Sequence, residues 1–367
     1  MLVIIVIVLL FAGLVILHEW GHYIAARRNG VGVEEFGIGF PPKVWGKKVK
    51  GTLYSVNLWP LGGFVRLRGE DTGDTRPGTF GGAKYLTKAK VLLAGVGMNL
   101  LTAVVILYVL CITGLPALGA GFEPRFLNYT YVQPRQLILV EVEKGSPAAT
   151  AGLKHGDYVL SANGNKLETD EDLRNFTKAN AGKEVLIHVR SNGDERDVKV
   201  KLREPNTKEG YLGVVSQQVY KLKFDPIQAL VAALYITGAL FVATVVGVVQ
   251  LLISIPVLLI NLFSSNVPKA AEAASGPLGI FFILKSISSL GYSYIFLFIA
   301  NIAVALAAFN VLPLPALDGG RLAIITYSKV SKQKVSPELE AKIHGIGFMV
   351  LIGLMVLISV YDLRKFL

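Results

Sequence analysis

The chain has 367 residues, of which 52% are hydrophobic and 17% charged, and its formal net charge is +11. This composition is too apolar for an ordinary soluble protein and includes polar stretches too long for membrane helices alone. We therefore expect a polytopic membrane protein with one water-soluble domain. The single cysteine, Cys111, excludes an intramolecular disulfide and a cysteine-rich metal site.

The positive charge lies beside the apolar segments. Residues 27–90 contain 12 Lys and Arg against 5 Asp and Glu, whereas residues 114–226 contain 16 against 15. A nucleic-acid binder would concentrate basic residues on its soluble part, so we expect no nucleic-acid partner. The distribution instead follows the positive-inside rule and predicts that the loop after residue 26 is cytoplasmic.

Residues 1–26 are predicted to form the first membrane helix, within an N-terminal membrane domain of residues 1–115. No basic region precedes the apolar run and no small-residue cleavage site follows it, so we do not expect a cleavable signal peptide. The helix contains His18, Glu19 and His22 in the pattern H-E-x-x-H. Histidines four apart share one helix face and can bind one zinc ion. Glu19 points roughly 100° away and is better placed to accept a proton from a metal-bound water.

Residues 52–70 are predicted to form a cytoplasmic-side β-hairpin of two short strands about a Pro-Leu-Gly-Gly turn that contains Gly62 and Gly63. The hairpin either has no special role or supplies an edge strand that holds a substrate extended beside the metal. The second predicted span covers residues 91–115 and contains Asn99 in the sequence GVGMN. Its small residues permit close helix packing, and Asn99 either bonds a neighbouring helix or takes part in substrate binding.

A linker is predicted at residues 116–134, and a soluble module at residues 135–204. Its segment SPAATAGLKHGD resembles the pattern of bacterial, circularly permuted PDZ domains, which implies an α+β fold. His155 and His188 lie in this module, and we interpret both as ordinary surface or packed histidines because neither has a suitably spaced partner.

The remaining residues, 205–367, are predicted to form a C-terminal membrane domain with spans at 293–313 and 343–362. A carboxylate, Asp318, follows Pro313 and Pro315, where the helix is broken. It is a candidate third metal ligand, although it could instead cap a helix end. If it binds the same metal as the histidines, its helix must also run from outside to inside. Residues 226–268 are then expected to lie along the outer side of the membrane, dip into it or form a short re-entrant hairpin.

The paired sequences HEWGH and NVLPLPALDGG resemble the motifs of the site-2 protease family of intramembrane zinc metalloproteases. This resemblance implies that Glu19 is the catalytic base and that zinc is bound by His18, His22 and Asp318. It also implies that Asn310 handles the substrate, and we place Asn99, Gly62 and Gly63 in the same predicted group. The chain departs from some relatives, which have Gly-Pro-x-x-Asn where GVGMN stands, or two PDZ domains.

The expected fold is a multi-pass α-helical membrane protein with about four spanning helices, a cytoplasmic-side β-hairpin and an inserted extracytoplasmic PDZ domain. By the resemblance, its substrates are single-span membrane proteins such as anti-sigma factors or signal-peptide remnants, trimmed first by a site-1-type protease. The expected location is the lipid bilayer of the bacterial inner membrane, with the N-terminus outside. A non-catalytic scaffold and a zinc transporter are the alternatives, but a scaffold needs no H-E-x-x-H set and no internal repeat supports a transporter.

Overall fold

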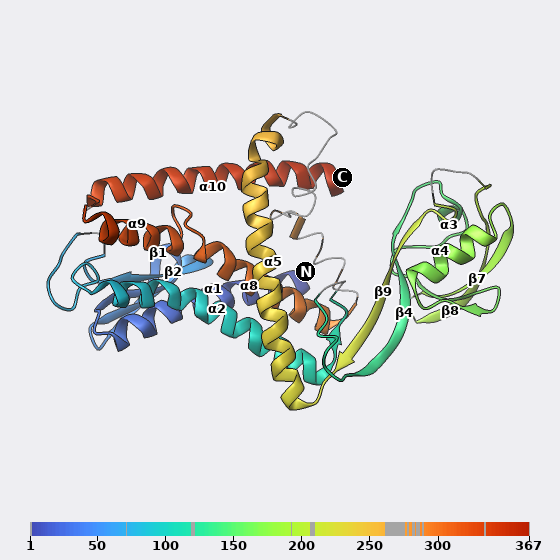
Figure 1. The fold of residues 1–367 in the computed structure, drawn as a ribbon, viewed down its shortest axis with the longest axis horizontal. Helices are drawn as coiled ribbons and strands as arrows, with labels where there is room; N and C mark the ends of the chain where they lie inside the picture. The colour runs from blue at the N-terminus through green and yellow to red at the C-terminus, as the bar shows by residue number, and fades with distance from the viewer. Residues whose placement is uncertain are drawn as a thin grey trace. The chain divides into compact units, whose positions relative to one another are not determined.

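The computed structural model describes residues 2–70, 72–118, 122–191, 193–205, 210–260, 276, 279, 280, 283, 287, 290–333 and 335–366. The chain forms two compact units. The first comprises Met1–Val109 with Leu230–Leu367, and the second comprises Leu110–Ala229. Figure 1 labels their helices and strands.

Long apolar helices make up most of the first unit. Among the described residues, five helices are long and apolar enough to cross a membrane, one more than the four or so that the sequence predicts. They confirm a multi-pass membrane protein, and four overlap the predicted spans. The five are α1 (Leu2–Arg28), α2 (Tyr85–Thr113), α5 (Pro226–Ile260), α8 (Tyr292–Val311) and α10 (Pro337–Phe366).

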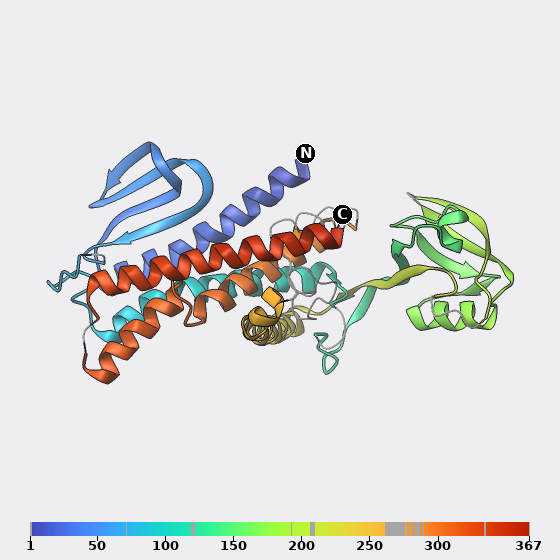
Figure 2. The same ribbon diagram turned by 90° about the horizontal axis from the view of Figure 1, so that it is seen from above.

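The extra helix, α5, corresponds to the segment whose placement the sequence leaves open. It is continuous from Pro226 to Ile260, so a hairpin turn within these residues is wrong, and residues 261–268 lie outside the described residues. In Figures 1 and 2, α5 runs across the direction shared by α2, α8 and α10. Leu240 and Phe241 of α5 pack against a cluster that includes Leu14 and Ile299. This crosswise direction distinguishes α5 from the other four helices.

A small sheet of two long, bent strands follows α1, β1 (Val33–Val49) and β2 (Thr52–Leu67). The predicted hairpin within residues 52–70 is wrong, because Pro60 to Gly63 bend one strand instead of joining two partners. Phe36 of β1 pairs with both Tyr54 and Val65, so residues 53–56 and 63–67 flank β1 on opposite sides. In this sheet the segment 63–67 therefore lies at one edge and the segment 43–49 at the other.

The helices α1 and α2 approach each other closely at Gly21. A Cβ atom added to Gly21 of α1 would lie 2.9 Å from the carbonyl carbon of Ala94 and closer still to its oxygen. Nearby, Ala103, Ala303 and Val304 are fully buried in the same cluster as Leu14. Small residues thus let the backbones approach, as is common between membrane helices.

The second unit is an α+β domain with a seven-stranded sheet in the order β3-β9-β4-β5-β7-β8, with β6 paired to β5. Its sheet extends beyond residue 204, because β9 pairs along β4. The strands are β3 (Leu115–Pro116), β4 (Thr130–Val142), β5 (Tyr158–Ala162), β6 (Asn165–Lys166), β7 (Glu184–Ser191), β8 (Asp194–Lys201) and β9 (Val214–Lys223).

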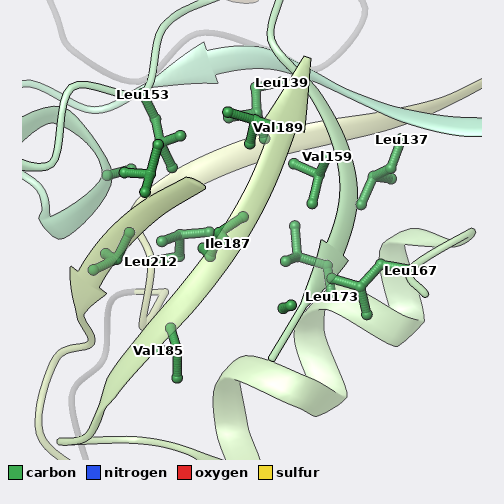
Figure 3. Close-up of a cluster of buried hydrophobic side chains, with 14 of the residues drawn as sticks. Leu137, Leu139, Leu153, Val159, Leu167, Leu173, Val185, Ile187, Val189 and Leu212 are labelled. Carbon is green, nitrogen blue, oxygen red and sulfur yellow. The ribbon is translucent and has the colours of Figure 1, made fainter. Parts of the chain in front are cut away.

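Two helices, α3 (Pro147–Thr150) and α4 (Asp170–Ala179), close the core of this unit. Ala148 of α3 and Leu173 of α4 join a fully buried cluster on the sheet that includes Leu139 and Ile187 (Figure 3). His188 lies on the exposed β7–β8 ladder, where bonds to Asp197 and Glu195 raise its pKa.

Candidate metal centre

Three side chains far apart in the sequence meet in the first unit. Nε2 of His18 and Nε2 of His22 lie 3.2 Å apart, and Oδ2 of Asp318 lies 3.2 Å from the first and 3.1 Å from the second. A tetrahedral zinc ion with bonds of about 2.0–2.1 Å separates its ligand atoms by about 3.3 Å. The donor set therefore fits one zinc ion.

Burial strengthens this fit. The two histidines are only 8% and 7% exposed, and Oδ2 of Asp318 is buried with no hydrogen-bond donor among the described residues. An ionised carboxylate in such a place is costly unless a cation or donor satisfies it. These atoms can therefore serve as three protein ligands, which is the usual number at a catalytic zinc site.

The orientation of His22 is set by the backbone of α2. Nδ1 of His22 lies 2.8 Å from the carbonyl oxygen of Val91 and donates to it, because a carbonyl oxygen only accepts. In the neutral ring, Nε2 is then left with its lone pair facing His18 and Asp318. A metal-ligating histidine commonly makes such a bond through its other nitrogen.

Asp318 is the first residue of α9 (Asp318–Ser331), and the residue at the N-cap is Leu317, which makes no side-chain cap. Asp318 therefore does not occupy the capping position that was the alternative to a ligand. The turn before Asp318 is stabilised by a hydrogen bond to a residue of α10. Ala316 has a left-handed backbone, with φ 74°, and its N–H donates to Nδ1 of His344 at 2.7 Å.

Further contacts fix α9 beside the sheet and α2. Arg321, three residues after Asp318, forms an ion pair with Glu70 just beyond β2. Tyr85 at the start of α2 bonds the hydroxyl of Thr326 at 3.2 Å, and the ammonium of Lys329 lies 3.9 Å from its ring centre. The helix that carries Asp318 therefore contacts both the end of β2 and the start of α2.

Glu19 lies apart from the three ligand atoms and against the edge segment 63–67 of β2. A Cβ atom added to Gly63 would lie 3.5 Å from Cγ of Glu19, and the backbone of Val65 lies close to the Glu19 carboxylate. Gly62 supplies the bend with a left-handed φ of 90°. Gly62 thus lies directly before the edge segment, and Gly63 begins it beside the predicted base.

The two predicted asparagines lie in different surroundings. Asn99 is fully buried and its side-chain amide lies 3.2 Å from Nδ1 of His18. Asn310 lies in the last turn of α8 and is partly exposed. No hydrogen bond of the Asn310 side chain is recorded among the described residues, so its role in substrate handling stays a prediction.

Sequence reasoning missed two residues. A Cβ atom added to Gly95 would lie 2.6 Å from Cε1 of His18 and closer to Nε2 of His22, so only glycine fits beside the imidazoles. His344, which holds the turn before Asp318, also went unnoticed. Val91, Gly95 and Asn99 are four residues apart, as the two histidines are, and this spacing could have pointed to Gly95. His344 is an isolated histidine, and no sequence pattern indicates its role.

The chain resembles known metalloproteases over nearly its whole length. A model of peptidase family M50 matches residues 6–354. The zinc metalloprotease RasP of Geobacillus kaustophilus is 27% identical, with 98% of this chain and 97% of the relative covered. A candidate zinc metalloprotease of Nostoc sp. is 30% identical, with 96% and 93% covered.

One solved structure resembles part of the chain. The PDZ domain of an SdrC-like protein from Listeria monocytogenes is 20% identical over 22% of this chain and 85% of that domain. Its TM-score is 0.20.

We predict that Gly95→Ala removes most of the zinc that copurifies with the chain, because the new methyl group collides with both imidazoles. The measurement is zinc content per chain after purification in detergent. The matched control is Gly97→Ala, since a Cβ atom there meets nothing within 4 Å. Equal zinc contents for the two variants would contradict the close packing of α2 against the histidines.

Proposed function

Because the chain belongs to peptidase family M50, the site-2 protease family, we propose that this membrane zinc metalloprotease performs regulated intramembrane proteolysis. It would hydrolyse a peptide bond in the transmembrane helix of a membrane protein. The observation that carries the proposal is the approach of the Asp318 carboxylate to within 3.2 Å of two imidazoles some three hundred residues earlier.

In this proposal His18, His22 and Asp318 hold the zinc. When bound, the ion polarises the peptide carbonyl and lowers the pKa of water towards 7. Glu19 is the general base, which removes a proton from the attacking water and passes it to the leaving amine. Its place outside the triangle of ligand atoms supports this role, because its carboxylate is free of the ligand set.

The edge segment 63–67 of β2 would bind the substrate as an added strand. A transmembrane helix has its amides bonded internally, so its scissile bond is accessible only after local unwinding. An exposed strand edge offers backbone groups for that extended conformation. The proximity of Gly63 and Val65 to Glu19 supports this proposal, because a strand added here would pass the base.

The substrates would be single-span proteins such as anti-sigma factors or signal-peptide remnants, trimmed first by a site-1-type protease. The basic loop after α1 supports a cytoplasmic position for the small sheet, with the N-terminus and PDZ-like unit outside a bacterial inner membrane. The PDZ-like unit would act as a size filter that excludes substrates with bulky outer domains. A scaffold without catalysis would not need the buried donor set.

We predict that Glu19→Gln lowers cleavage of a model transmembrane substrate by roughly 10²–10⁴-fold, because the amide cannot accept the proton. Zinc content should stay at the wild-type level, since Glu19 is not a ligand. The measurements are cleavage in detergent or proteoliposomes and metal analysis of the same preparation. A variant that cleaves at the normal rate would disprove the assignment of the base.

A cross-linking experiment tests the edge strand. In a Cys111→Ala, Glu19→Gln chain, Arg66→Cys lies on the edge segment beside the base, whereas Lys47→Cys lies on the opposite outer segment of the same sheet. We expect Arg66→Cys to form disulfides with cysteines placed near the scissile bond of a model substrate, and Lys47→Cys to form few. Equal cross-linking from both positions would argue against strand addition at residues 63–67.

A shortened chain tests the size filter. Ile138 and Gln217 are paired neighbours on β4 and β9, so a short Gly-Ser turn can replace residues 139–216 while the rest of this ladder is retained. We expect this chain to cleave substrates whose outer domain has not been trimmed, which the full-length chain rejects. The control is equal cleavage of a trimmed substrate by both chains. Unchanged rejection of the untrimmed substrate would exclude the filter.

A further inference from the structure

One face of α2 serves both histidines of α1. Val91, Gly95 and Asn99 follow one another at four-residue intervals and so lie on the same side of the helix. Val91 accepts from His22 through its carbonyl oxygen, Gly95 leaves space for both rings, and the Asn99 side chain reaches Nδ1 of His18 at 3.2 Å. The two imidazoles therefore each have a neighbour on α2.

We infer that Asn99 is a positioning residue for the metal, whose side-chain oxygen accepts a hydrogen bond from Nδ1–H of His18. This inference rests on the proposed zinc site. It gives His18 the same arrangement as His22, with Nδ1 bonded to α2 and Nε2 directed to the metal. Second partners of this kind hold the ring orientation and tautomer of metal-binding histidines.

The unsatisfied atom at this place supports the inference. Asn99 is fully buried, and its Oδ1 has no hydrogen-bond partner among the described residues, while Nδ2 lies beside His18. The two ends of an asparagine amide are chosen from the surrounding hydrogen bonds. Rotating this amide by 180° places Oδ1 against Nδ1–H of His18, so the buried oxygen gains a donor and His18 gains an acceptor.

The same geometry argues against a direct contact between Asn99 and the substrate. With no exposed surface and its amide against a ligand's ring, the side chain contacts the imidazole from the side opposite Nε2. A substrate carbonyl has to approach the metal, which the Nε2 atoms and Asp318 surround. Asn99 therefore acts on the reaction through His18.

The test compares zinc dissociation constants of full-length chains in detergent, measured by competition with a chelator. Asn99→Leu keeps the branched shape of the side chain and removes the acceptor, and we expect zinc binding about 10–100-fold weaker than wild type. Asn99→Asp keeps an acceptor oxygen and should bind zinc within a few-fold of wild type. Thr102→Ala is the matched control, because Thr102 lies on the same helix and, among the described residues, its hydroxyl donates to the Met98 carbonyl rather than to either histidine.

Apo-protein stability and substrate kinetics separate the remaining explanations. Wild-type zinc affinity in Asn99→Leu, with a lower unfolding temperature of the zinc-free chain, would overturn the inference in favour of a purely structural contact between helices. Wild-type zinc affinity with a raised KM would overturn it in favour of substrate binding. A different result would show that the proposed zinc site itself is wrong: Asp318→Ala would then bind zinc as tightly as wild type.

Discussion

The close contact between α1 and α2 is the constraint on which the metal centre depends. Two imidazoles in an apolar interior need hydrogen-bond partners for the nitrogens that face away from the metal. Because Gly21 and Gly95 carry no side chain, the backbone of α2 lies near enough to the rings for Val91 to bond one of them. Any larger residue at position 95 would separate the helices and move the rings away from Asp318.

The third candidate ligand imposes a second constraint, because Asp318 follows irregular backbone in a membrane domain. Unpaired backbone groups are tolerated at such depth only where protein or water satisfies them. Here His344 accepts from the N–H of Ala316, and Gly347 of α10 leaves room for Pro315 to pack against it. The last helix thus stabilises the turn that directs Asp318 towards α1, without itself contributing to the donor set.

The sequence predicts the spanning helices, because long apolar runs are a local signal, and its paired motifs lead us to expect the approach of Asp318 to His18 and His22 that the structure shows. Other features depend on contacts that no local pattern contains. Pro60 to Gly63 have the composition of a turn, yet pairing of Val65 with Phe36 makes them a bend within one strand. In α2 nearly every position is apolar, so periodicity cannot indicate that the face with Gly95 and Asn99 meets α1. The crosswise direction of α5 is likewise not indicated by its composition, which is apolar throughout like that of the other spans.

The position of Glu19 connects the chemistry with recognition of the substrate. Glu19 follows His18 by one residue on α1, so its side chain points away from the face that carries His18 and His22 and reaches the segment 63–67. The backbone of Gly63 and Val65 lies close to the Glu19 side chain, so the edge of β2 passes beside the proposed base. A peptide paired with that edge would have its backbone aligned before it meets the base, and the register of pairing would then decide which bond is cut. Selectivity for a cleavage site can therefore arise from backbone geometry alone, with little demand on the side chains of the substrate.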